Sequence, residues 1–293
     1  MRRALVLAGL AVVTLGVAGA DAATPAFRWG VAAGEVTATS AVLWSRAPAA
    51  GRVRLAGTSL KTGRKEFLRD MRALPANDFT VQARVTGLRP GTRYTYSFSF
   101  SPGRFSGAVG TFVTAPPPTA DTRVRFAISG DADATPARNG KPAFPFAVYA
   151  RMAAERNDFN INLGDTIYSD SGVGGAPFAR TVQQKWAKYR LALGQPALRT
   201  LRASAGLYSH WDDHEFVNDF SRPEHGEALY RAGVKAFRDY SPVTYSSPLG
   251  LYRSVRWGRH LELFFLDERS FRSAKATAAC SGDLAPTAPQ TVR

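Results

Sequence analysis

The stretch Phe159-Asn160-Ile161-Asn162-Leu163-Gly164-Asp165-Thr166-Ile167-Tyr168 joins a strand-like apolar run to a carboxylate and a phenol. Two other apolar runs end in a similar way: Val124–Ile128 leads into Ser129-Gly130-Asp131, and Leu207–His210 leads into Trp211-Asp212-Asp213-His214-Glu215. The carboxyl ends of neighbouring strands in an α/β sheet share one edge, where ligands bind. Because carboxylates gathered there would repel one another without cations among them, the spacing predicts a metal site and metal-dependent hydrolysis.

The Gly164-Asp165 pair lies directly after the strand-like run. Glycine lets the backbone bend sharply as it leaves a strand, so the Asp165 side chain can point over the edge of the sheet. Tyr168, three residues further on, can reach the same space, and a phenolate is a hard ligand suited to a trivalent ion. The alternative is an ordinary turn, in which aspartate is common.

The block from Trp211 to Glu215 is more specific. A solvated helix start would explain Asp212 or Asp213 as a cap and Glu215 as an acidic residue of the first turn. It would not explain a tryptophan directly before the acids or His214 among them. We therefore interpret this block as functional.

Two further segments contribute candidate residues. Asp131 and Asp133 follow the first strand, and either could simply form an Asx turn, but Asp131 lies nearer the strand end and is the expected ligand. Arg269 could clamp a phosphate with its planar fork of donors, or it could pair with Asp267 or Glu268 in a structural role. The remaining histidines are expected to be surface or structural residues: His210, His225 and His260.

The composition sets the broad class. The chain has 293 residues, enough for about two domains, and 45% hydrophobic and 21% charged residues are ordinary for a folded protein. The net charge of +15 favours polyanions, phosphorylated substrates or an anionic cell envelope, or it is background surface charge. We find no zinc-finger spacing, no basic stripe interleaved with aromatic residues and no recognition-helix signature, so no specific nucleic-acid recognition is expected.

The N-terminal residues are typical of a targeting segment. Arg2-Arg3 precede an apolar run from Ala4 to Ala20, and Ala20-Asp21-Ala22 fits a cleavage site, so residues 1–22 are predicted to be a signal peptide that directs export to the periplasm, the cell envelope or the medium. The choice between the general and the twin-arginine export route stays open. Cys280 is the single cysteine, which leaves either a free thiol or a missing partner.

The pattern along the chain predicts two domains. Residues 25–115 read as an all-β domain, in which Leu88–Tyr94 resembles the tyrosine corner of fibronectin type III domains and Trp44 would pack in the core. Residues 116–120 contain three consecutive prolines and form the predicted linker, and residues 121–293 read as mixed α/β.

The expected elements of both domains follow from hydrophobic periodicity. The predicted strands are Ala41–Ser45, Arg52–Ala56, Thr80–Val85, Tyr94–Phe100, Gly110–Thr114, a buried Val124–Ile128, Phe159–Leu163 and a hairpin of Arg253–Trp257 and Leu261–Asp267 turning at Gly258. The predicted helices are Phe144–Glu155, Val182–Leu193 and Ala228–Tyr240. In the first helix, the apolar face is expected to contain Phe144, Ala147, Val148, Arg151 and Met152.

The Gly164–Tyr168 and Trp211–Glu215 blocks together resemble the PhoD-like alkaline phosphatase family of calcineurin-like metallophosphoesterases. The resemblance covers the chain from about Phe27 to its end, including the β-sandwich and the Leu266–Arg272 segment. It implies a fibronectin type III-like β-sandwich followed by part of an α/β metallophosphoesterase sandwich. It also implies an exported phosphatase or phosphodiesterase in which two metal ions activate a water.

The resemblance implies a role for each site residue. Asp165 would bridge two metal ions, Tyr168 would bind the iron-like ion as a phenolate, and Asp131 would be the ligand from the first strand. Asp213 would be a metal ligand with a part in catalysis, and His214 would hydrogen-bond the phosphate or protonate the leaving oxygen. The cofactors it implies are calcium and iron, which suit hard oxygen ligands.

The sequence departs from the family pattern in two places. Many relatives have a cysteine just after the first strand, where this chain reads Ser129-Gly130-Asp131. The family also continues well past the point where this chain stops, so we expect a fragment of a longer enzyme. One rival hypothesis is a non-catalytic module that binds anionic envelope polymers next to an incomplete α/β domain. Another is a metal hydrolase acting on sulfate or acyl esters, although no Gly-x-Ser-x-Gly elbow is present.

Overall fold

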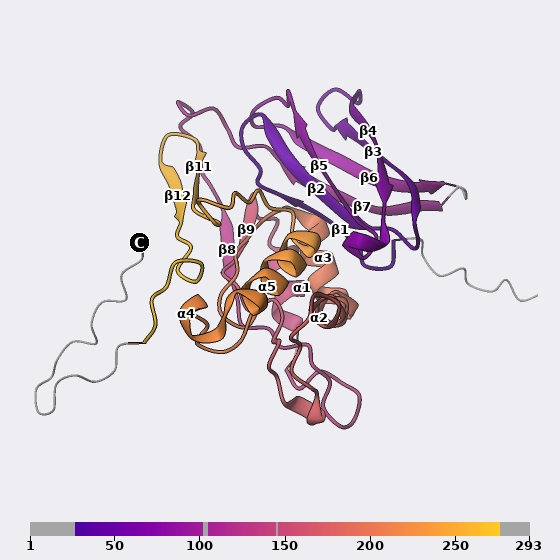
Figure 1. Cartoon of the computed structure of the whole chain (residues 1–293). Helices are drawn as coiled ribbons and strands as arrows, with labels where there is room; N and C mark the ends of the chain where they lie inside the picture. The colour runs from indigo at the N-terminus through magenta and orange to yellow at the C-terminus, as the bar shows by residue number, and fades with distance from the viewer. Residues whose placement is uncertain (1–26, 102–104, 145, 276–293) are drawn as a thin grey trace, which may run out of the picture.

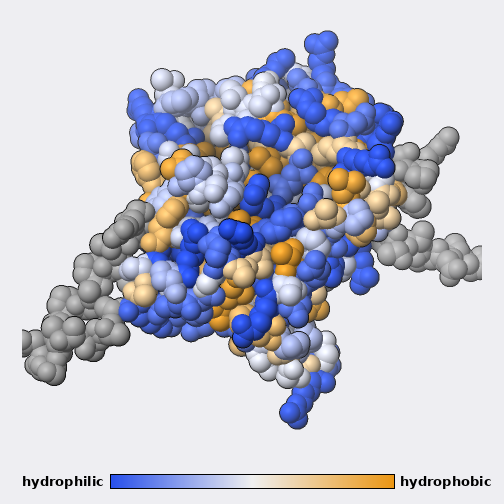
Figure 2. All heavy atoms as spheres, in the orientation of Figure 1, coloured by the Kyte–Doolittle hydropathy of each residue, from blue (hydrophilic) through white to orange (hydrophobic). Residues whose placement is uncertain are grey.

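The computed structural model describes residues 27–101, 105–144 and 146–275. The predicted signal peptide and Cys280 lie outside these residues. Figure 1 shows the strands of the N-terminal half at the upper right, the helices below them and the last hairpin at the left. The face drawn in Figure 2 is mostly hydrophilic, interrupted by smaller apolar patches.

The N-terminal half is a β-sandwich of the fibronectin type III kind. Its strands are β1 (Val31–Gly34), β2 (Ser40–Arg46), β3 (Gly51–Ser59), β4 (Lys65–Ala73), β5 (Thr80–Thr86), β6 (Arg93–Ser101) and β7 (Phe105–Val113), with a 3-10 turn at Pro75–Asn77. All five predicted strands are present. The sequence patterns missed β1, which is short and rich in alanine, and β4, whose exposed positions carry charges.

The tyrosine corner is confirmed. Tyr94 is fully buried, and its phenolic oxygen accepts a hydrogen bond of 2.9 Å from the backbone N–H of Arg89. The ring stacks on Phe112 with 5.4 Å between ring centroids. This contact fixes the corner of the four-stranded sheet, whose strand order is β4-β3-β6-β7.

The second sheet runs through both halves of the chain. Its order is β5-β2-β1-β10-β9-β8, in which β8 (Phe126–Ser129), β9 (Phe159–Asn162) and β10 (Gly206–Ser209) are parallel. β1 pairs with β10 at Ala33 and Gly206, so one sheet carries the sandwich strands and the α/β strands side by side (Figure 1). The predicted linker also contacts the last hairpin, because the carbonyl of Ala120 accepts from the backbone N–H of Arg259 at 2.9 Å.

Trp44 packs on the opposite face from the one predicted. Adjacent residues of a strand point to opposite faces, and Leu43 fills the sandwich core while Trp44 faces the helices. Its indole N–H donates to the carbonyl of Asp239 at 2.7 Å, and its ring lies 5.9 Å from that of Tyr240. The residue therefore joins the sandwich to the helical layer.

The helices cover the Trp44 face of the long sheet. They are α1 (Ala147–Ala154), α2 (Val182–Gly194), α3 (Pro196–Ser204), α4 (Arg222–His225) and α5 (Glu227–Tyr240), with a 3-10 turn at Val173–Gly175. α2 begins with a capping box between Thr181 and Gln184. α2 and α5 match the predicted helices, whereas α3 and α4 were not predicted.

The predicted apolar face of α1 is wrong except at Met152. Phe144 and Val148 are 56% and 57% exposed, while Phe146, Tyr149 and Met152 are buried. These three residues recur every third position, and the rings of Phe146 and Tyr149 lie 5.6 Å apart. The two aromatic side chains fill more core volume than Val148 would, so they decide which face turns inward.

The strands of the α/β half differ from the prediction in the positions of their ends and in the burial of β8. β8 was expected to be buried, but Ile128 is 54% exposed, because β8 has a sheet neighbour on only one side among the described residues. The hairpin of β11 (Arg253–Trp257) and β12 (Leu261–Phe265) is confirmed, with Gly258 at a φ of 63° in the turn. In the part of the chain that the structure describes, no helix is both long and apolar enough to cross a membrane.

Candidate metal centre

The parallel strands β8, β9 and β10 bring the three predicted acidic segments to one edge of the sheet. Gly164 leaves β9 with a φ of 125°, and a Cβ there would lie 2.3 Å from the backbone nitrogen of Asp212. Only glycine allows that close approach. Asp165 follows with a φ of 51°, so the chain reverses directly after the strand and presents its carboxylate to the Trp211–Glu215 block.

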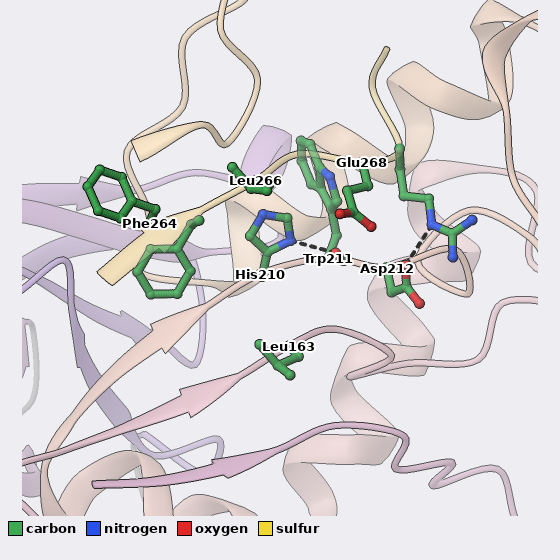
Figure 3. A pocket seen from close by; sticks show the side chains of 9 residues that line it. Leu163, His210, Trp211, Asp212, Phe264, Leu266 and Glu268 are labelled. Carbon is green, nitrogen blue, oxygen red and sulfur yellow. Dashed lines mark hydrogen bonds and ion pairs between the residues drawn. The ribbon is translucent and has the colours of Figure 1, made fainter. Parts of the chain in front are cut away.

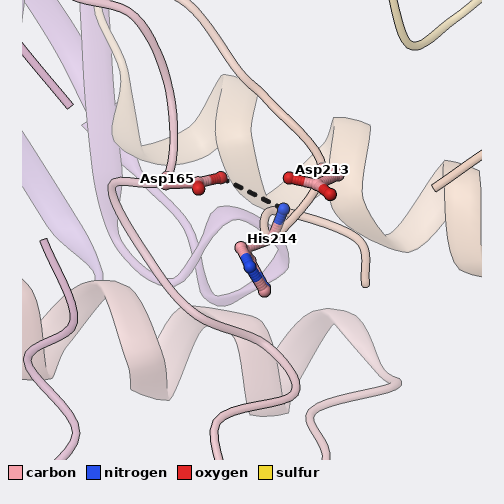
Figure 4. Close-up of side chains that lie close together, drawn as sticks. All are labelled: Asp165, Asp213 and His214. Carbon is pink, nitrogen blue, oxygen red and sulfur yellow. Dashed lines mark hydrogen bonds between the residues drawn. The ribbon is translucent and has the colours of Figure 1, made fainter. Parts of the chain in front are cut away.

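Asp165, Asp213 and His214 form the centre of the site (Figure 4). Each offers one ligand atom, and these atoms lie within 4.8 Å of one another. The Asp165 carboxylate accepts the backbone N–H of His214 at 3.2 Å. Burial, together with the negative charges of Asp213 and Asp212, raises the pKa of Asp165 to about 6. A cation among these oxygens would relieve that repulsion.

His214 is held by a carboxylate that the sequence patterns missed. Its Nδ1 lies 2.6 Å from an oxygen of Asp170, whose other oxygen accepts the backbone N–H of Asn218 at 2.9 Å. Burial acts to lower the pKa of His214, but the hydrogen bond and charge of Asp170, with the charges of Asp165 and Asp213, raise it to about 9. With Nδ1 bound to Asp170, Nε2 is left to act on a ligand.

Tyr168 and Asp131 lie beside this centre. The Tyr168 ring stacks on His214 with 4.1 Å between ring centroids, and its hydroxyl lies 3.5 Å from an Asp131 oxygen. Burial and the charges of Asp165 and Asp131 raise the pKa of the Tyr168 phenol. Asp131 is exposed and adopts a left-handed φ of 55° at the end of β8, so its carboxylate reaches the same edge as Asp165.

Glu215 is fully buried and binds backbone rather than solvent. Its carboxylate accepts the N–H groups of Asp165 at 3.1 Å, Thr166 at 2.8 Å and Asp212 at 2.9 Å. Burial, together with the charge of Asp165, raises its pKa to about 8 despite these bonds. The alternative interpretation of Glu215 as a solvated first-turn acid is therefore wrong, because its carboxylate joins the loop after β9 to the loop after β10.

Arg269 reaches the site from the segment after β12. Its Nε donates to Asp212 at 2.6 Å, and another guanidinium nitrogen lies 3.7 Å from Asp213. The structural alternative of a side-chain pair with Asp267 or Glu268 is not what the structure shows. Instead, Asp267 is buried and accepts from the indole of Trp211 at 2.9 Å.

A cavity of about 380 Å³ opens between this arginine and the end of β12 (Figure 3). It is lined by Leu163, His210, Trp211, Asp212, Phe264, Phe265, Leu266, Glu268 and Arg269. His210 is 7% exposed, and its Nδ1 lies 2.6 Å from the carbonyl of Trp211, so the predicted structural role fits. Burial lowers the pKa of His210 and keeps the ring neutral.

Three other candidate residues form local structural contacts outside the metal centre: Asp133, His225 and His260. Asp133 forms the expected Asx turn, because one oxygen accepts from the backbone N–H of Thr135 at 2.7 Å and the other from the Ser171 hydroxyl at 2.5 Å. His225 lies next to Ser221 at the end of α4, and His260 pairs with Asp121 at 2.9 Å. None of the three belongs to the Asp165–Asp213–His214 group.

The set of donor groups at this sheet edge fits metal ions that prefer oxygen ligands. It consists of carboxylates, one phenol and one imidazole at one sheet edge, where burial and the charges of Asp213 and Asp212 raise the pKa of Asp165. The sequence patterns did not indicate the supporting residue Asp170. Asp170 stands in a Ser-Asp-Ser-Gly stretch that reads as a loop, and its distance of two residues from Tyr168 was the one available signal.

Comparison with known proteins identifies the family of both halves of the chain. A model of the PhoD-like phosphatase family matches residues 137–291, and a model of the PhoD-like phosphatase N-terminal domain matches residues 13–116. Alkaline phosphatase D of Bacillus subtilis (strain 168) is 27% identical over 290 residues, a match that covers 85% of this chain and 48% of the relative. A solved structure described as the structure of PhoD is 24% identical and has a TM-score of 0.74, covering 87% of this chain and 54% of that one.

This chain therefore spans about half the length of the relatives that it matches. The family models nevertheless cover both the sandwich and the α/β half, and the shared fold extends over 87% of this chain. The chain belongs to the PhoD-like phosphatase family.

Proposed function

We propose that this chain carries the metal-binding and phosphate-binding edge of an exported phosphoesterase that hydrolyses phosphate monoesters or diesters. The observation that carries the proposal is the grouping of Asp165, Asp213 and His214 within 4.8 Å, with Tyr168 stacked on the imidazole. Such a group combines cation ligands with a proton donor in one place.

Asp165, Asp213, Tyr168 and Asp131 would hold the cations, for which we propose calcium and iron. Bound there, the ions would neutralise charge on the phosphoryl group and lower the pKa of the attacking water. Asp165 follows β9, the strand that lies between β10 and β8, so its carboxylate lies between Asp213 and Asp131 along the sheet edge. This central position suits a ligand that two cations share.

His214 and Arg269 would act on the substrate itself. Asp170 fixes Nδ1 of His214 at 2.6 Å and favours the protonated ring, so Nε2 can hydrogen-bond the phosphate or give its proton to the leaving oxygen. Arg269 is anchored to Asp212 through Nε, which leaves its terminal nitrogens to orient a phosphate oxygen. A location outside the cytoplasm is a further proposal, which rests on residues 1–22.

The test is the metal content of purified residues 23–293 beside that of an Asp165→Asn variant, followed by hydrolysis assays. We expect bound calcium and iron that the variant loses, and release of p-nitrophenol from p-nitrophenyl phosphate or its bis-ester but not from the sulfate or acetate. Binding of an anionic polymer without any hydrolysis, strongly weakened by salt, would favour the envelope-binding alternative. N-terminal sequencing of the secreted product tests export, with a start near Ala23 expected.

A further inference from the structure

A buried lysine lies directly behind the metal centre. Lys185 belongs to α2 and has no exposed surface. Its Nζ donates three hydrogen bonds: to the Ser169 hydroxyl oxygen at 2.7 Å, to the Glu215 carbonyl at 3.0 Å and to the Phe216 carbonyl at 3.1 Å. The ammonium group has three protons, so its donor capacity is fully used.

The three acceptors come from the two loops that carry the site. Ser169 stands between Tyr168 and Asp170, and the carbonyl of Glu215 directly follows His214. The loops are joined at the same place by the backbone N–H of Ser169, which donates to the carbonyl of His214 at 3.0 Å. One ammonium therefore ties the segment 165–170 to the segment 213–217.

Packing alone does not account for a charged residue at this position. Burying an ammonium group costs several kcal/mol, and an apolar side chain of similar size would fill the same space without that cost. Burial lowers the pKa of Lys185 to about 7, against the opposing charges of Glu215 and Asp170. The Glu215 carboxylate does not neutralise it by direct contact, because that group binds the amides of Asp165, Thr166 and Asp212.

We propose that Lys185 is a positioning residue of the metal centre, whose ammonium holds the Tyr168–Asp170 loop against the turn after His214. This proposal deepens the proposed function and rests on it. The hydrogen bond to Ser169 fixes the positions of the neighbouring residues Tyr168 and Asp170. The hydrogen bonds to the two carbonyls after His214 hold the imidazole within hydrogen-bonding distance of Asp170.

The matched pair of variants is Lys185→Met and Lys188→Met. Lys188 lies on the same helix, is 8% exposed and donates to the Thr135 hydroxyl at 2.9 Å instead of to the site loops. Both substitutions remove a buried ammonium and keep an unbranched apolar stem. A general effect of removing a buried charge from α2 would therefore appear in both.

Two readouts on the folded chain are independent of turnover. The first is Mn²⁺ affinity, measured from the electron paramagnetic resonance signal of the free ion. The second is the proton NMR signal of the His214 Nδ1–H bound to Asp170, assigned with a His214→Gln variant. We expect Lys185→Met to weaken Mn²⁺ binding about 10- to 100-fold and to shift or abolish that signal, whereas Lys188→Met leaves both unchanged.

An unchanged affinity and an unchanged His214 signal in folded Lys185→Met would overturn the proposal. If Lys185→Met does not fold, the Ser169→Ala variant tests the proposal instead. It removes the hydrogen bond between Lys185 and the Tyr168–Asp170 loop and leaves the lysine in place. The same two readouts then apply, with changes in the same direction expected. If the wild-type chain binds no Mn²⁺, the proposed function fails, while the His214 signal still tests the role of Lys185.

Discussion

Replacing Asp165 by asparagine should stabilise the metal-free chain and at the same time remove its response to metal ions. Asp165 is 5% exposed and faces Asp213, so its ionised form is unfavourable until a cation arrives. Asparagine has nearly the same shape, and its amide oxygen can still accept the backbone N–H of His214. The substitution therefore removes charge repulsion and a ligand together.

The size of the effect follows from the pKa of Asp165, which rises from 3.8 to about 6. A shift of about two units corresponds to roughly 3 kcal/mol, and solvent screening at the partly open site reduces this to about 1–2 kcal/mol. Because the folded-state pKa is raised, the contribution of the neutral carboxyl is complete below pH 3.8 and is lost as the pH rises through 6. The variant should therefore equal the wild type near pH 3.5 and exceed it above pH 6.

The assay is urea unfolding of both proteins without metal at pH 7.5, then thermal unfolding with added Ca²⁺. At a Ca²⁺ concentration 100-fold above its Kd, the wild type should gain about 2.7 kcal/mol and the variant should gain nothing. Asp133→Asn is the matched control, since its carboxylate binds Thr135 and Ser171, and it should keep the Ca²⁺ response. A less stable Asp165→Asn chain that still responds to Ca²⁺ would refute the reasoning.

Three further substitutions test separate parts of the molecule. Tyr94→Phe loses the hydrogen bond from Arg89 and should lower the free energy of unfolding in urea by about 1–2 kcal/mol. Gly164→Ala places a Cβ 2.3 Å from the Asp212 nitrogen at a φ of 125°, so we expect a loss of about 2 kcal/mol or more and weaker Ca²⁺ binding by calorimetry. Arg269→Gln should weaken inorganic phosphate binding about tenfold, with a thermal stability change of only about 0–1 kcal/mol; equal phosphate affinity would exclude a substrate role.

Much of the fold could be predicted because local patterns agreed with the final packing. The residue spacing of Val182–Leu193 predicted α2, and Gly258 predicted the turn of the last hairpin. The errors occur where a choice between faces depends on the neighbours. Trp44 and Val148 are both apolar, and only the layers packed around them decide that one is buried under α5 and the other is exposed.

The candidate site shows the same division. Gly164-Asp165 and the block after β10 were recognisable because their residue types are unusual directly after apolar runs. Asp170 and Lys185 were not, since an aspartate in a loop and a lysine in a helix are common. Their roles arise from hydrogen bonds to residues 44 and 16 positions away, at His214 and Ser169.

The sequence by itself therefore determined which residues directly follow the strands and the order of those strands along the chain. It also determined the family that the Gly164–Tyr168 and Trp211–Glu215 blocks indicate. Only the tertiary structure decided that one sheet runs through both halves and that Glu215 is buried beneath the site. The physical reason is that residue type and spacing control the local backbone, whereas burial depends on which distant segments pack nearby. A glutamate carboxylate on a surface binds water, whereas the buried carboxylate of Glu215 binds three backbone amides.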